Sequence, residues 1–252
     1  MSVSDLDICN FAYEGSLLKL QQEILEKKNL IAIKDQSGRV PLHWAASAGH
    51  IDIVDYLLQM GAYVDPRDEL DWTPLIISVS AGMKDVVQIL INYGADVNAV
   101  NKTGQSPIHY AASKNRLQIA ETLLDRCAQV NVFDATSGGT PLHRASSRGH
   151  SQMVSLLLKH HANPDCVDLE GNTPLHMACE EDRTYIAQLL VESNANMSLV
   201  NKQSLEYSIV FPCSCLLGEE NCFGISQQTA CQPLEEINRI VRKLKNFMQI
   251  GH

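Results

Sequence analysis

Long apolar runs are missing from this chain of 252 residues. No stretch of about eighteen uninterrupted apolar residues occurs, so we expect no membrane-spanning helix and no membrane partner. The opening segment MSVSDLDICNFAYEG has early acids and no continuous apolar core, which argues against a secretory signal. We therefore expect a protein of the cytoplasm and nucleus.

Basic residues are scarce, because 20 lysines and arginines face 29 acids and leave a formal charge of −9. A nucleic-acid-binding protein needs a basic footprint, so this balance argues against DNA or RNA as a partner. The content of 45% hydrophobic and 19% charged residues is ordinary for a folded protein and excludes global disorder.

Catalytic and cofactor motifs are also absent from the sequence. It has no G-x-S-x-G elbow, no P-loop and no H-E-x-x-H, and no Cys–His pair has a third group to orient it. We expect a non-enzymatic protein with no cofactor and no metal site. Cys9, Cys127, Cys166 and Cys179 are scattered singly, which is typical of small buried side chains in a reducing compartment.

What the chain does contain is an internal repeat. Prolines recur at Pro41, Pro74, Pro107, Pro141 and Pro174, with spacings of 33, 33, 34 and 33 residues. Around each proline the order is the same: a turn opened by Asp or Asn, usually a Thr or Ser N-cap, proline at the first helical position, a short helix, and a second helix with an apolar stripe. The one extra residue lies in the turn segment ATSGG.

One such helix pair cannot bury its apolar face alone, so the units must stack. The sequence therefore predicts an all-α solenoid over residues 1–203. Its units are an N-terminal cap at 1–33 and full repeats at 34–66, 67–99, 100–132, 133–166 and 167–199.

Four histidines recur once per period, at His43, His109, His143 and His176. Stacking places them in a ladder with steps of roughly 10 Å, too far apart to converge on one metal ion. We expect each imidazole to hydrogen-bond loop backbone and tie neighbouring repeats together. Repeat two, with Ile76 in this column, should lack that tie.

This repeated order of turn, N-cap, proline and two helices resembles that of the ankyrin-repeat family. The resemblance implies a concave surface lined by the turns and the first helices, and a partner protein bound there. Exposed Trp, Tyr and Arg dominate interface energetics, and the charges run acidic, basic and acidic along the stack. The candidate contact residues are Arg39, Trp44, Asp68, Glu69, Trp72, Tyr110, Lys114, Arg116, Arg144, Arg148, Glu180 and Glu181.

Several segments contain residues that the general repeat pattern does not require. These segments resemble the gankyrin family, the ankyrin-repeat subunits and assembly chaperones of the proteasome regulatory particle. They are ICNFAYEG, LHWAASAGH, VNAVNKTGQSPIHYAASKNR and EGNTPLHMACEEDR. The resemblance implies a monomer whose concave face clasps the C-terminal domain of a proteasomal ATPase during assembly of the base. It makes Arg39, Lys114 and Glu181 contact residues, with Asp68, Glu69 and Trp72 beside them.

The same family is described as binding a cell-cycle kinase and a retinoblastoma-type protein, the latter through Leu-x-Cys-x-Glu. Here Met177 replaces the leucine of that motif, which ends at Glu181, and Cys179 falls in a helical column that should be buried. We therefore discount this motif. The alternative function is an ankyrin adaptor for a cell-cycle kinase or a transcription factor.

The resemblance weakens after residue 203. Residues 204–232 hold Cys213, Cys215, Cys222 and Cys231, whose spacing fits no common zinc knuckle, and we expect a poorly ordered segment. Residues 233–252 carry an amphipathic helical stripe that could replace a terminal cap. A ubiquitin-ligase adaptor box in this tail is a weaker alternative, since its leucine-cysteine-arginine core is not evident.

Overall fold

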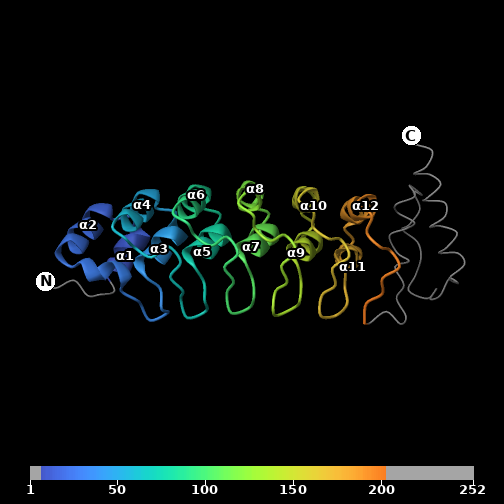
Figure 1. Ribbon diagram of the computed structural model, residues 1–252, viewed down its shortest axis with the longest axis horizontal. Coiled ribbons are helices and arrows are strands. Elements are labelled where there is room, and N and C mark those ends of the chain that lie inside the picture. The colour runs from blue at the N-terminus through green and yellow to red at the C-terminus, as the bar shows by residue number, and fades with distance from the viewer. Residues whose placement is uncertain (1–6, 203–252) are drawn as a thin grey trace, which may run out of the picture.

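A row of paired helices forms the protein in a computed structural model that describes residues 7–202 (Figure 1). Within this range the chain is all-α, without a β-strand, as the repeat predicts. The helices are α1 (Asp7–Glu14), α2 (Leu17–Glu26), a 3₁₀ turn η1 (Lys28–Ala32), α3 (Pro41–Ala48), α4 (Ile51–Gln59), α5 (Pro74–Ala81), α6 (Lys84–Asn92), α7 (Pro107–Ser113), α8 (Leu117–Asp125), α9 (Pro141–Arg148), α10 (Ser151–Lys159), α11 (Pro174–Glu180) and α12 (Thr184–Glu192).

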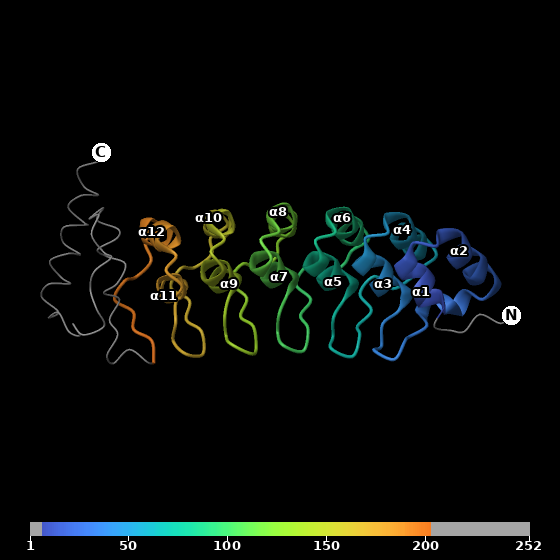
Figure 2. The same cartoon turned by 180° about the vertical axis from the view of Figure 1, so that it is seen from behind.

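The repeats stack in three parallel rows. The first helices (α3, α5, α7, α9, α11) lie between the second helices (α4, α6, α8, α10, α12) and a row of long loops, and Figure 2 shows the same order from behind. Each first helix packs on the first helices before and after it, and α1 packs on α3 at the N-terminal end.

Local sequence explains where the first helices begin and end. Proline occupies the first turn of each, and the hydroxyls of Thr73 and Thr173 accept hydrogen bonds from backbone nitrogens three residues later, at 3.3 Å. Gly49, Gly82 and Gly149 end α3, α5 and α9 with φ of 82°, 86° and 80°. This left-handed conformation costs glycine little, which explains why these three helices end there.

The second helices end in a further left-handed column: Gly61, Gly94, Cys127, His161 and Asn194, with φ between 62° and 92°. Cys127 thus replaces a turn glycine and is exposed. The prediction that the scattered cysteines are buried is right for Cys9 and wrong for Cys127. Cys166 and Cys179 are half-buried.

The core runs along the whole stack as a continuous column. Leu57, Leu90, Leu123, Leu157 and Leu190 lie on successive second helices and are fully buried. Their spacing reproduces that of the prolines, so each repeat covers the apolar face of its neighbour.

The predicted cysteine-containing segment 204–232 and the predicted amphipathic helix 233–252 lie outside the described residues.

Candidate binding surface

The ladder histidines are structural, and hydrogen bonding fixes their tautomer. In His43, His109, His143 and His176, Nδ1 accepts the backbone N–H of the residue three before, at 3.1–3.2 Å. Nε2 must therefore carry the proton. Burial lowers the pKa of all four, in His109 to about 4, so the neutral form is maintained.

The protonated Nε2 reaches the next repeat. His43 donates to the carbonyl of Trp72 at 3.1 Å, His109 to that of Gly139 at 3.2 Å, and His143 to that of Asn172 at 2.9 Å. These bonds confirm the predicted ties between neighbours. Nε2 of His176 is buried and has no hydrogen-bond partner among residues 7–202.

The residue after each ladder position faces the loop of its own repeat. Nε1 of Trp44 donates to the carboxylate of Asp35 at 2.9 Å, and Arg144 pairs with Asp134 at 2.7 Å. Because these side chains meet, the column lies in the corner between the first helices and the loops. We call this corner, with the residues one helical turn later, the inner face.

Aromatic side chains line the N-terminal half of the inner face. Trp72 and Tyr110 stand 4.8 Å apart between ring centroids, and Trp44 packs edge-on against Tyr13 and under the guanidinium of Arg39. The rings of Trp44, Trp72 and Tyr110 remain partly exposed. They are rigid surfaces held by their neighbours, which suits them to contact a partner at low entropic cost.

Two predicted contact residues are engaged inside the protein instead. Asp68 is only 6% exposed, and its carboxylate accepts from the backbone nitrogens of Leu70 and Trp72 and from Nε of Arg39. It closes the turn of its loop, so its side chain offers little surface to a partner. Arg144 is half-buried, and its pairing with Asp134 makes it part of the scaffold.

Lys114 and Arg148 are exposed one turn after Tyr110 and Arg144, at the ends of α7 and α9. Residues four apart share a helix face, so both lie on the inner face. Neither makes an ion pair or a side-chain hydrogen bond within residues 7–202. The carboxylates of Glu180 and Glu181 are likewise exposed at the end of α11, and Glu69 is exposed on its loop.

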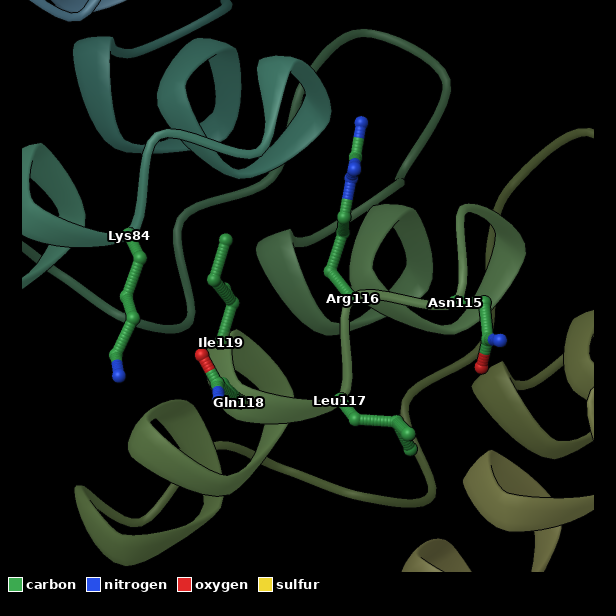
Figure 3. A pocket seen from close by; sticks show the side chains of 6 residues that line it. All are labelled: Lys84, Asn115, Arg116, Leu117, Gln118 and Ile119. Atoms are coloured by element: carbon green, nitrogen blue, oxygen red, sulfur yellow. The ribbon is translucent and has the colours of Figure 1, made fainter.

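Arg116 is exposed and also makes a contact within the scaffold. Its guanidinium lies over Gly82 and donates to the carbonyl of Ala81 at 3.3 Å, at the C-terminal end of α5, where a cation is favoured. The residue also borders an open depression between α6 and α8. Figure 3 shows its lining: Lys84, Asn115, Arg116, Leu117, Gln118 and Ile119.

The Met177–Glu181 segment is helical up to Glu180, within α11, with Cys179 half-buried rather than buried as predicted. An extended motif cannot be presented there without unwinding the helix. Among residues 7–202 no group of three metal-ligating side chains occurs, and no helix there is long and apolar enough to cross a membrane.

Models of the ankyrin repeat match most of this solenoid, at residues 63–134 and 128–201 for three-repeat blocks and at 37–69 for a single repeat. The chain belongs to the ankyrin-repeat family. The fold agrees with this: the ankyrin-repeat domain of Bcl-3 superimposes with a TM-score of 0.71 at 25% identity, over 78% of this chain and 89% of that one.

Among the curated relatives, two illustrate matches over shorter stretches. The 26S proteasome non-ATPase regulatory subunit 10 of Homo sapiens is 49% identical over 70 residues, which are 28% of this chain and 31% of the relative. Ankyrin repeat family A protein 2 of Bos taurus is 41% identical over 64 residues, 25% of this chain and 20% of the relative. The matched stretches thus span less than a third of either relative, and the first supports a gankyrin-like relation.

Ankyrin-repeat proteins are interaction modules, and this chain is a protein-interaction scaffold. The positions that line the inner face are predictable from the sequence, because they recur at the period of the repeat. Sequence reasoning missed which of their charges are already paired, because Asp134 and Arg144 are ten residues apart and meet only when the loop folds back.

Proposed function

We propose that this scaffold is an assembly chaperone of the proteasome regulatory-particle base, and that its inner face binds the C-terminal domain of a proteasomal ATPase. The observation that carries the proposal is a set of exposed charges, beside rigid aromatic rings, that form no ion pair within residues 7–202: basic Lys114 and Arg148, then acidic Glu180 and Glu181. Uncompensated charge of alternating sign selects a partner with the opposite pattern and fixes its register. The identity to the human proteasome subunit supports the choice of partner.

In this proposal the scaffold acts by shape and charge, without catalysis, as a monomer in the cytoplasm and nucleus. Arg39 and Trp72 contribute contact area, whereas Asp68 and Arg144 hold the loops in place. Since rim charges act mainly on association, the complex should weaken as salt is raised.

The test is a binding series between the full chain and the isolated C-terminal domain of each proteasomal ATPase, followed by calorimetry. One domain should bind, and the double variant Lys114→Glu, Arg148→Glu should bind it at least tenfold more weakly. The control is Lys84→Glu, Lys159→Glu, which makes the same charge change at exposed positions on second helices and should bind normally.

Failure of the wild-type chain to retain any of these domains would remove the proposed function. Equal binding by both double variants would support the ATPase domain as the partner but show that it binds a surface other than the inner face. Native purification of the chain distinguishes the proposal from the adaptor alternative, in which a kinase or transcription factor would be recovered in place of a proteasomal ATPase.

A further inference from the structure

The outward side of the loop row carries an apolar strip that the proposed function does not use. Around the turn residues, exposure alternates: Phe133 and Ala135 are exposed on either side of buried Asp134, and Val167 and Leu169 are exposed on either side of half-buried Asp168. Alternate residues of an extended segment point to the same side. The side chains flanking the turn residue therefore share one face, turned away from the first helices.

The apolar residues gather at the C-terminal end of that face. We define the loop strip as Phe133, Ala135, Val167, Leu169 and Val200, of which the four larger side chains are 48–66% exposed. The equivalent pair two loops earlier, Arg67 and Glu69, is charged. The strip is therefore a local feature of this chain, since the repeat does not require apolar residues at these positions.

Backbone hydrogen bonds hold the strip in register. Ala135 donates to the carbonyl of Thr103 at 2.9 Å, Leu169 to that of Ser137 at 2.8 Å, and Lys202 to that of Glu170 at 2.9 Å. Each loop tip is thus fixed to the one before it. The strip is a preformed surface, and a partner would not have to order it.

Cations border the strip at both ends. Lys102 precedes it on the loop of Val100, and Nζ of Lys202 folds back to the carbonyl of Leu169 at 2.6 Å beyond it. Arg67 adds a third cation, with Nη1 donating to the carbonyl of Val100 at 2.9 Å. The exposed carboxylate of Glu170 lies at a loop tip within the strip. A complementary partner has acidic groups at its ends and none at its centre.

The step between loops favours an α-helix over a β-strand as the partner's contact element. Stacked helices are about 10 Å apart, so equivalent strip residues repeat at about that distance. Seven residues of an α-helix advance about 10.5 Å and return to nearly the same face. Three residues of an extended strand also advance about 10 Å, but an odd step turns the side chain to the opposite face. A helix can thus meet successive loops with one face, and a strand cannot.

We propose that the loop strip binds an amphipathic helix of a partner protein, with apolar side chains at every seventh residue and acidic residues at both ends. The inference rests on the proposed function only in that the chain is a protein-binding scaffold. The inference describes one structural element of the partner, in addition to the charged groups that the inner face is proposed to bind.

The probe is a fluorescent synthetic helix of three heptads, with leucine at the repeating position and glutamates at both ends, titrated with the full chain in an anisotropy assay. A second peptide has lysines in place of the terminal glutamates. A third has the same composition with prolines that prevent a helix. The first peptide should bind saturably, and the other two at least tenfold more weakly.

The diagnostic variant is Phe133→Ser, Val167→Ser, which removes two half-exposed apolar groups and should weaken binding of the first peptide at least tenfold. The matched control is Leu18→Ser, Tyr185→Ser, at positions 82% and 63% exposed on α2 and α12, which should bind as wild type does. Circular dichroism of both variants establishes that each is folded.

Three results would overturn the inference: no saturable binding at millimolar peptide, equal binding by the loop-strip variant, or equal binding of the lysine-ended or proline peptide. Sedimentation of the chain alone adds a fourth, since self-association lost in the loop-strip variant would make a second copy the occupant. These outcomes are separate from the proposed function, because the peptide assay contains no ATPase domain. Charge reversal at Lys114 and Arg148 tests that function independently.

Discussion

Acidification should weaken this solenoid through its histidine ladder, most of all at His109. Nδ1 of His109 accepts from the backbone N–H of Ser106 at 3.1 Å, and Nε2 donates to the carbonyl of Gly139 at 3.2 Å. A proton on Nδ1 would turn that acceptor into a donor facing an N–H group. Protonation therefore breaks the start of α7, and it places a charge at a buried site.

The size of the effect follows from the pKa. Burial lowers the pKa of His109 from 6.5 to about 4, which corresponds to about 3.4 kcal/mol at about 1.36 kcal/mol for each pKa unit. Because the folded-state value is below the unfolded one, the unfolded chain binds more protons between these values. The stabilisation is complete above pH 6.5 and is lost as the pH falls towards 4. At pH 5 the loss is about 2 kcal/mol.

Urea unfolding followed by circular dichroism at pH 7 and pH 5 measures this loss. The variant His109→Ile copies the natural residue of repeat two, where Ile76 is fully buried in the same column. It should be less stable than wild type at pH 7, and its decrease on acidification should be smaller by about 2 kcal/mol. The control is His161→Asn, at an exposed histidine that makes no ladder bond. This variant should lose as much stability between pH 7 and pH 5 as wild type does.

An equal decrease in wild type and His109→Ile would refute the reasoning, because the ladder histidine would then contribute no proton-linked stability. A larger decrease in the variant would show that protonation of His109 stabilises the fold, contrary to the predicted direction.

Two further predictions concern the loops. Gly104 and Gly61 both have positive φ, but a Cβ on Gly104 would lie 2.5 Å from a backbone nitrogen of the next loop, whereas one on Gly61 meets nothing within 4 Å. Gly61→Ala should cost about 1 kcal/mol and Gly104→Ala at least about 2 kcal/mol by urea unfolding, and equal costs would exclude the loop contact as the cause. Arg144→Met should cost roughly 2 kcal/mol, because it removes the ion pair of a carboxylate, Asp134, whose side chain is fully buried, while Arg148→Met should leave stability unchanged. Similar costs for the two arginines would show that the Asp134 pair adds nothing. For Asp134 itself burial raises the pKa, but hydrogen bonds from the following loop backbone and from Arg144 lower it below its usual range, so this contribution should fade in acid as well.

The repeat itself was predictable because a solenoid is nearly one-dimensional. Each unit meets only its neighbours, so a period of 33 residues in the sequence becomes a column in space. The prolines and the apolar stripes therefore predicted the helices, and the histidines recurring once per period predicted the ladder of His43, His109 and His143.

The state of individual side chains was less predictable. The position of a residue in the repeat predicts which surface it lies on, but not whether its charge is paired with a neighbouring side chain. Asp68 and Arg144 form ion pairs, whereas Lys114 and Arg148 form none within residues 7–202. Cys127 was misjudged for a related reason. A single scattered cysteine is typically buried, and only the alignment of Cys127 with Gly61 and Gly94 marks it as a turn residue.

The amino-acid sequence by itself determined the architecture, the tie between repeats and the positions of the inner face, because these depend on local signals repeated at a fixed period. Only the tertiary structure decided which charges remain unpaired and which apolar residues form the loop strip. Both depend on contacts between a loop and its own helix or the next loop, and the strength of such contacts is set by distance and burial rather than by period.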